Sequence, residues 1–324
     1  MRKLSFAQAT LEAMSEEMAA DDKVFVMGED IARQGGIFGQ FKGLGQKFPG
    51  RVLDTPISET FICGGGVGAA LAGARPVVDM HFIDFVGVCM DEVNNQMAKI
   101  RYMFGGQCKM PLVMRAPDGM SGGGAAQHSQ SLEGWLMHIP GIQVVATSYP
   151  YDAKMVLKAA IRSNDPVIYL ENKVLYKEKG NMPEIEDEVP YIIGKAKVVR
   201  EGKDVTIVSY SIGMKAALGA AEELAKEGIE AEVIDLITVS PWDREAVFES
   251  VKKTHRLVIC HEAVKQAGVS AEISAVVAEE MIEHLDAPVL RYGAPFCPIP
   301  FATTLEKMVK IYPEDLVKGI KGMF

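Results

Sequence analysis

Short apolar runs alternate with longer segments of helical periodicity along nearly the whole chain. The apolar runs are almost uninterrupted by polar residues, as residues 24–27, 167–170 and 257–260 illustrate. Strands with a continuous apolar sequence are typical of parallel sheets, because helices cover both faces of such a sheet. The repeated strand–helix alternation therefore predicts an α/β fold with two doubly wound domains.

A change in composition divides this alternation into two parts. Residues 177–190 are rich in charge, contain two prolines and show no periodicity, which is typical of a solvated linker. We therefore expect one domain over residues 1–176, a linker over residues 177–190, and a smaller α/β domain over residues 191–324. A chain of 324 residues, 48% of them hydrophobic, is long enough to bury two cores.

Helical spacing and capping residues place three helices in the first part of the chain. We expect a helix over residues 6–20 with Ser5 as its N-cap, and another over residues 60–72. A third, long helix is expected over residues 85–103, because two glycines follow it.

Composition excludes several classes of protein. The net charge is −9 and the basic residues are scattered, whereas nucleic-acid binding requires clustered positive charge. No apolar run reaches about 18 residues, the length that spans a membrane, and residues 1–6 lack the apolar core of a secretory signal. The five cysteines lie far apart without a CxxC pair, so we expect free thiols and a cytoplasmic protein rather than disulfides or a zinc site.

The stretch from Asp54 to Ala70 contains a single acid at the start of a Gly/Ala-rich helix. Ser58 is a good N-cap residue, and Glu59 follows it as the one charged side chain between Asp54 and Arg75. Such a carboxylate either caps the helix or transfers protons. Capping is the ordinary role, since acids are common in the first turn of a helix.

The same stretch partly resembles a dinucleotide fingerprint. Gly64, Gly66 and Ala69 fit the relaxed glycine pattern, and Asp84 follows at about the expected spacing. A buried strand should lead directly into those glycines, but Pro56 and Glu59 interrupt any such strand. We therefore regard a nicotinamide site as a minor alternative.

A second polar cluster lies in a flexible loop. Residues 122–131 place His128 among small residues, amides and hydroxyls. Histidine is the side chain best suited to move protons near neutral pH, although a surface loop can also hold a histidine without function. Ser129 or Ser131 as a nucleophile is the competing enzymatic interpretation, but no GxSxG elbow is present.

Several motifs in register resemble the β subunit of thiamine-diphosphate-dependent 2-oxo acid dehydrogenases, a family that includes pyruvate, branched-chain and acetoin dehydrogenases. The similarity extends in order along the whole chain. The motifs that carry it are Gly28-Glu29-Asp30, Asp54-Thr55-Pro56-Ile57-Ser58-Glu59, Gly73-Ala74-Arg75-Pro76-Val77, Ala125-Ala126-Gln127-His128-Ser129-Gln130-Ser131, Ile139-Pro140-Gly141, Pro298-Ile299-Pro300 and Leu305-Glu306.

The resemblance implies a transketolase-like pyrimidine-binding domain followed by a transketolase C-terminal-like domain. It also assigns roles to individual residues. Glu59 matches the glutamate that hydrogen-bonds the aminopyrimidine ring of the cofactor, Phe85 matches the aromatic residue that stacks on that ring, and Ile57 matches a further cofactor contact. His128 matches the histidine near the reacting carbon, which is implicated in proton transfer and in passing the acyl group to a lipoyl arm.

Ions and partners follow from the same resemblance. Magnesium would be held by a separate α subunit, whose Gly-Asp-Gly motif is absent here, within an assembly of two α and two β chains. A dihydrolipoyl acyltransferase core with its lipoyl domain would accept the acyl group. A structural potassium ion would be bound mainly by backbone carbonyls at the matching positions, which are Leu112, Ala160, Ile161, Ser163 and Asp165.

Residues 101–106, 131–133 and 137–141 look most like the acetoin branch. Val88 stands where pyruvate-type relatives often carry a polar side chain, which weakens the assignment to pyruvate. Two alternatives stay open. One is a transketolase-like or other thiamine-dependent carboligase half, and the other is a non-catalytic scaffold subunit, which the presence of both Glu59 and His128 disfavours.

Overall fold

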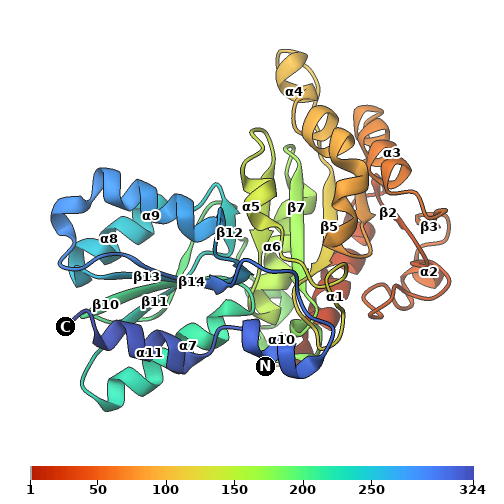
Figure 1. Cartoon of the computed structure of the whole chain (residues 1–324). Helices are drawn as coiled ribbons and strands as arrows, with labels where there is room; N and C mark the ends of the chain where they lie inside the picture. Colours follow the sequence, from red (N-terminus) through yellow and green to blue (C-terminus); the bar gives the residue numbers. More distant parts are fainter. Residues whose placement is uncertain (1) are drawn as a thin grey trace. The chain divides into compact units, whose positions relative to one another are not determined.

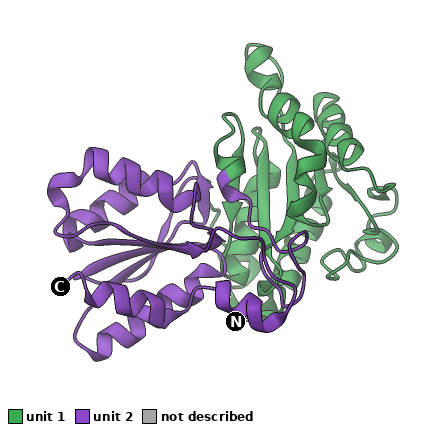
Figure 2. Ribbon diagram, viewed as in Figure 1, with its two compact units in different colours: residues 1–118, 135–193 green, residues 119–134, 194–324 purple. Residues whose placement is uncertain are grey.

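The structure is a computed structural model that describes residues 2–324 and divides into two compact units (Figure 2). The first unit extends to Asp118 and resumes over Trp135–Ile193, and the second contains Gly119–Gly134 and Gly194–Phe324. The short segment that carries His128 therefore belongs to the second unit, although the chain places it in the middle of the first.

A parallel sheet forms the centre of the first unit, with strand order β6-β7-β5-β4-β2-β3. The α/β prediction is confirmed here, because every one of these pairings is parallel. The strands are β2 (Val24–Gly28), β3 (Val52–Asp54), β4 (Arg75–Asp79), β5 (Val113–Asp118), β6 (Gln143–Ala146) and β7 (Val167–Asn172). The accompanying helices are α1 (Phe6–Ala20), α2 (Leu44–Lys47), α3 (Glu59–Leu71), α4 (Ile100–Met103), α5 (Glu133–Met137) and α6 (Pro150–Arg162).

The first helix begins as its sequence predicts. Ser5 is the N-cap of α1, its hydroxyl accepts from the Gln8 N–H at 3.2 Å, and the Gln8 side chain accepts from the Ser5 N–H at 2.9 Å. This capping box satisfies two backbone donors at the helix start. Strand β1 (Arg2–Ser5) precedes it and pairs antiparallel with β8 (Lys179–Met182), so the segment predicted as a linker contains a short strand.

The prediction of one long, regular helix over residues 85–103 is wrong, because the segment is not a continuous α-helix. The segment is divided into η1 (Ile83–Cys89, a 3₁₀ helix), η2 (Glu92–Met97, a π-helix) and α4. Asn95 is exposed and donates to the Asp91 carboxylate at 2.6 Å. Irregular helix of this kind is common at functional sites.

The second unit is built on a sheet with strand order β14-β13-β10-β11-β9. Its central pairings are parallel, and β9 pairs antiparallel at one edge. Figure 1 shows α7 (Gly213–Lys226) and α11 (Pro313–Lys321) on one face of this sheet and α8 (Arg244–Thr254) and α9 (Val269–Glu280) on the other. The strands of this sheet are β9 (Lys197–Arg200), β10 (Val205–Ser209), β11 (Ala231–Asp235), β13 (Leu257–Val264) and β14 (Leu290–Ala294), and the short strand β12 (Thr238–Ser240) lies outside it.

Four of the helices of this unit cover its core, and α10 (Thr303–Val309) follows the last strand. Helix α9 ends at Glu280 and is followed by a 3₁₀ turn, Ile282–His284. The four helices are α7 (Gly213–Lys226), α8 (Arg244–Thr254), α9 (Val269–Glu280) and α11 (Pro313–Lys321).

The five cysteines all lie within the described residues and are unpaired. Across residues 2–324, no helix combines the length and the apolar character needed to cross a membrane.

Candidate active site

Glu59 is the first residue of α3, at the carboxyl edge of the parallel sheet in the first unit. Ser58 is the N-cap, as expected, but its hydroxyl lies 3.3 Å from the Thr60 hydroxyl and makes no hydrogen bond to the helix backbone. Glu59 is half-buried, and among the described residues its carboxylate has no hydrogen-bond or ion-pair partner. The carboxylate therefore has its full acceptor capacity available for a group from outside the chain.

The glycines of α3 serve two different purposes. A Cβ on Gly66 would lie 2.7 Å from Val78 and 3.0 Å from Leu112, so this glycine lets the helix pack closely on the sheet. A Cβ on Gly68 would meet nothing within 4 Å, because this residue faces outward. The glycines lie inside the helix rather than at its first turn, which removes the dinucleotide alternative.

Phe85 lies in η1, which packs against α3. Its ring is half-buried and meets Phe82 edge-to-face, with centroids 5.7 Å apart. Ile57 and Val88 are both exposed, Ile57 to 74% and Val88 to 59%. The first unit thus presents a carboxylate, an aromatic ring and exposed apolar side chains on neighbouring elements.

His128 lies on an exposed loop of the second unit. The loop is curled, since Gly122 and Gly123 have φ of 86° and 92° and Ala125 has φ of 57°. Left-handed backbone favours glycine, and alanine adopts it at an energetic cost. Ser129 is only 2% exposed, which makes it a poor nucleophile, whereas His128 is exposed.

Two carboxylates hold this loop in place. Glu306, which is 1% exposed, accepts from the N–H of Gly122 at 3.0 Å and from that of Gly123 at 2.9 Å. Glu262 accepts from the N–H of Met120 at 3.1 Å. Burial alone would raise the pKa of Glu306, but the Lys310 ammonium at 2.8 Å and the glycine N–H donors lower it below its ordinary value. Glu306 is therefore a charged anchor for the His128 loop.

A cavity of about 340 Å³ lies between the His128 loop, the end of β13 and the residues that follow β14. Behind the loop, burial raises the pKa of Glu133 to about 7, its own backbone N–H opposes this, and the charge of Glu262 raises the pKa further. The cavity is lined mainly by Met120, Ser129, Gln130, Glu262, Cys297 and Ile299.

The sequence analysis did not identify the anchoring role of Glu306 and Glu262. Glu306 lies 184 residues from Gly122, and no local pattern links the two positions. Glu262 is half-buried near the end of β13, and its position directly after the apolar run over residues 257–260 is the one sequence signal that points to it.

The neighbouring His261 is structural. Its Nε2 lies 2.8 Å from the Ser270 hydroxyl and its Nδ1 lies 3.1 Å from the Ala263 carbonyl oxygen. Burial lowers the pKa of His261 to about 4, against the opposing effect of the Ala263 carbonyl. The ring is therefore neutral at physiological pH.

The five positions assigned to potassium all have carbonyl oxygens that already accept a hydrogen bond. One Arg75 nitrogen donates to both Ile161 at 3.1 Å and Ser163 at 2.9 Å. The remaining carbonyls accept from Val167 N–H at Leu112, from Ser163 N–H at Ala160 and from the Ser163 hydroxyl at Asp165. The guanidinium of Arg75 thus supplies positive charge to part of this set.

Comparison with known domain families identifies the class of protein to which the chain belongs. Residues 2–179 match the transketolase pyrimidine-binding domain, and residues 194–316 match the transketolase C-terminal domain. A split-gene transketolase, described as an inactive β4 tetramer, superposes with a TM-score of 0.81 at 24% identity and covers 99% of this chain and 98% of its own. The chain therefore has the transketolase-like fold that the sequence predicts.

Three relatives identify the family within this class. The chain is 47% identical to the β subunit of acetoin:2,6-dichlorophenolindophenol oxidoreductase from Cupriavidus necator, over 95% of this chain and 93% of that one. It is 44% identical to the pyruvate dehydrogenase E1 component subunit beta of Rickettsia felis (98% of both chains) and 42% identical to the 2-oxoisovalerate dehydrogenase subunit beta of Bacillus subtilis (100% and 99%). The chain belongs to the family of β subunits of thiamine-diphosphate-dependent acetoin and 2-oxo acid dehydrogenases.

Thiamine diphosphate is the cofactor of this family, and the described residues fit one part of it. The unpartnered Glu59 carboxylate suits a ring nitrogen, and Phe85 offers an aromatic surface. The one group of acids close enough together to hold a metal is, within residues 2–324, Glu12, Glu16 and Glu188, and lysines already neutralise it.

Proposed function

We propose that this chain supplies the pyrimidine half of an active site that cleaves acetoin or decarboxylates a 2-oxo acid such as pyruvate, and passes the acyl unit to a lipoyl group. The observation that carries the proposal is the free carboxylate of Glu59 at the start of α3. A half-buried acid without a partner is costly to keep unless a ligand uses it. The family relationship indicates that this ligand is the pyrimidine ring of thiamine diphosphate.

The bound cofactor supplies a thiazolium carbon that acts as nucleophile and electron sink. Glu59 holds the proton that is shared with a pyrimidine ring nitrogen, and Phe85 packs against the ring. His128, on its anchored loop, moves a proton at the reacting substrate. The role of Glu306 is positional, because it fixes Gly122 and Gly123 and touches no reacting group.

The α subunit would contribute magnesium and the diphosphate site, and the outward face of α3 is the surface that we assign to it. Gly68 has open space around it, and Phe61 and Leu71 are 53% and 45% exposed on the same helix. An exposed glycine inside a helix costs about 1 kcal/mol relative to alanine, and small residues allow a second backbone to approach closely. Two such α–β pairs would form the complete enzyme, which would deliver its acyl group to the lipoyl domain of an acyltransferase core.

Potassium binding at Leu112, Ala160, Ile161, Ser163 and Asp165 belongs to the same proposal. Carbonyl oxygens have two lone pairs, so each can accept a hydrogen bond and still ligate a cation. Thermal unfolding in potassium chloride and in sodium chloride of equal ionic strength tests this, since only a specific site raises the melting temperature in potassium alone. We also place the enzyme in the cytoplasm, in keeping with its five unpaired cysteines.

Among the possible substrates we favour acetoin. Val88, which is apolar and exposed near Phe85 in η1, lacks the polar side chain common in pyruvate-type relatives. The test is to co-express the chain with its α partner and compare turnover of acetoin, pyruvate and a branched-chain 2-oxo acid. Preference for a 2-oxo acid would move the enzyme to another branch of the family. Turnover only of sugar phosphates would support the carboligase alternative, and no turnover with intact assembly would support the scaffold.

A further inference from the structure

We propose that the second unit binds a phosphorylated small metabolite in a further cavity, at the carboxyl end of β14. The cavity has a volume of about 670 Å³, within the range of small-molecule sites. Residues after β13, along β14 and between α10 and α11 line it. Its cationic residues are Lys265, Arg291 and Lys310, and Asp315 is its one acid among the lining residues.

Two of these three cations have no counter-ion within the part of the chain that the structure describes. Lys310 lies 2.8 Å from Glu306, so its charge is already neutralised. Among residues 2–324, neither Lys265 nor the half-buried Arg291 has an ion-pair partner. The carboxylate of Asp315 accepts from the Tyr312 N–H at 3.0 Å at the start of α11. Partial burial of an unpaired guanidinium is unfavourable, and a bound anion would relieve it.

The number and chemical type of the unpaired cations indicate which class of anion the cavity would bind. A phosphate monoester carries a charge of about −1.5 to −2 at neutral pH, which matches two cations, whereas one carboxylate matches only one. The planar guanidinium of Arg291 can bind phosphate oxygens through two parallel hydrogen bonds. Lysine acts beside it as a point charge.

The remaining wall of the cavity is apolar. Phe296 and Met308 line it and are each 78% exposed, and Val309 and Ile311 contribute further apolar surface. An exposed aromatic ring and a thioether favour a flat ligand over a compact ion. A phosphate monoester with a flat, partly apolar portion, such as a nucleoside monophosphate, therefore fits the cavity better than inorganic phosphate.

Calorimetric titration of the assembled holoenzyme, saturated with thiamine diphosphate and magnesium, tests this proposal. The probes are AMP, ribose 5-phosphate, adenosine and citrate. We expect AMP to bind most tightly, ribose 5-phosphate more weakly, and adenosine not measurably. Arg291→Gln and Lys265→Gln should each weaken AMP binding at least about tenfold, the scale of one charge-assisted hydrogen bond. Lys318→Gln, which removes an exposed charge on α11 outside the cavity, should change binding less than twofold.

Three results would overturn the proposal. The first is the absence of binding heat for every probe at millimolar concentration, and the second is an equal loss of AMP binding in Lys318→Gln. The third is adenosine or citrate binding as tightly as AMP, since the phosphate would then not be the recognised group. Because the holoenzyme is already saturated with cofactor, these outcomes are independent of the roles proposed for Glu59 and His128.

Discussion

Glu59 accepts no hydrogen bond from residues 2–324, and we expect its charge to have a function that a neutral amide cannot replace. Glu59→Gln keeps the size and most of the packing of the side chain, so we expect α3 to stay folded. Proton–deuterium exchange at the thiazolium carbon of the assembled enzyme should fall by about 10²–10⁴-fold, the contribution of one acid–base group.

Glu283→Gln serves as the control, because it removes an exposed carboxylate from the second unit. Exchange at the wild-type rate in Glu59→Gln would leave Glu59 with a helix-terminal role only. Equal losses of exchange in Glu59→Gln and Glu283→Gln would show that the change in net charge causes the loss.

His128 is expected to act at a different step from Glu59. A histidine on a curled loop can reach a reacting carbon, but the tautomers of the pyrimidine do not require it. His128→Ala should therefore impair acylation of a lipoyl domain more than it impairs thiazolium exchange. Single-turnover acylation and deuterium exchange, measured on the same preparation, compare the two steps. A parallel loss of both would show that the two residues share one role.

At the scale of elements, the His128 loop depends on a helix far away in the sequence. Hydrogen bonds to a buried charged group are worth about 1.5–3 kcal/mol, and Glu306 makes two such bonds to glycine N–H groups. In Glu306→Gln we expect faster hydrogen exchange at Gly122 and Gly123, together with an approximately tenfold or greater loss of lipoyl acylation. Thiazolium exchange should stay at the wild-type rate.

Lys310→Met is the matched variant for this anchor. It removes the ion pair at 2.8 Å but leaves the carboxylate to accept from both glycines, so its effect should be the smaller one. A larger effect from Lys310→Met would mean that the ion pair, rather than the hydrogen bonds, holds the loop.

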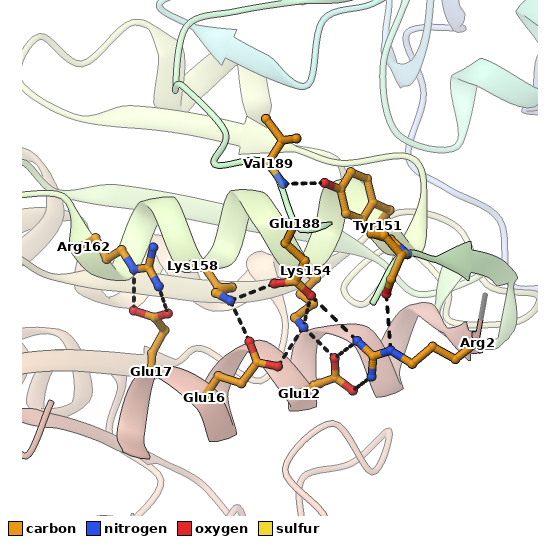
Figure 3. A network of polar contacts seen from close by, with 11 residues as sticks. Arg2, Glu12, Glu16, Glu17, Tyr151, Lys154, Lys158, Arg162, Glu188 and Val189 are labelled. Atoms are coloured by element: carbon orange, nitrogen blue, oxygen red, sulfur yellow. Dashed lines mark hydrogen bonds and ion pairs between the residues drawn. The ribbon is translucent and has the colours of Figure 1, made fainter. Parts of the chain in front are cut away.

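A second long-range anchor joins α1, α6 and the end of the segment over residues 177–190 (Figure 3). The Lys154 ammonium is fully buried and contacts Glu12 at 2.5 Å, Glu16 at 2.7 Å and Glu188. Removing one partner from a buried ion network costs about 3–5 kcal/mol, because the other charges lose their counter-ion. Lys154→Met should lower the free energy of unfolding by that amount, measured by urea denaturation at pH 7. Lys226→Met, at an exposed pair with Glu223, should cost less than about 1 kcal/mol.

The sign of the pH dependence follows from the pKa directions in this network. Burial would raise the pKa values of Glu12 and Glu188, but their basic partners lower both overall. Groups with lowered pKa stabilise the fold above their unfolded pKa, and this stabilisation is lost as pH falls through the folded value. Burial would lower the pKa of Lys154, but its three carboxylates raise it, so that contribution persists to high pH. The difference between wild type and Lys154→Met should therefore be largest near neutral pH and shrink in acid.

The elements themselves were largely predictable, whereas the contacts between distant elements were not. Apolar runs and caps identified β2, α1, α3 and the sheets, because these features are local in sequence. The helix over residues 85–103 was predicted as regular, since periodicity does not distinguish a 3₁₀ or π turn from an α turn. Glu59 and His128 were selected from their motifs, and their roles stay predictions. Glu306 and Gly122 lie 184 residues apart, so no local sequence pattern could predict the hydrogen bond between them.

For the whole molecule, we expect the active site to need a second chain. Thiamine diphosphate needs a metal and positive groups for its diphosphate, because the phosphates carry most of its charge. The candidate metal-binding acids that the described chain offers are already paired with lysines. No Gly-Asp-Gly sequence occurs in the 324 residues. The glycine-bearing outer face of α3 remains open for a partner.

We therefore expect that the β chain alone neither binds thiamine diphosphate tightly nor turns over substrate. Calorimetric titration with cofactor and magnesium should show weak or no binding for the isolated chain and tight binding after the α subunit is added. Gly68→Leu provides the structural control, because its side chain enters open space in the free chain and should leave folding intact while it blocks close approach of a second helix. Tight cofactor binding in that variant after α is added would place the α subunit on another surface. Tight binding and turnover by the β chain alone would contradict both the division of the active site and the role of α, because the metal and diphosphate would then have to be held by this chain.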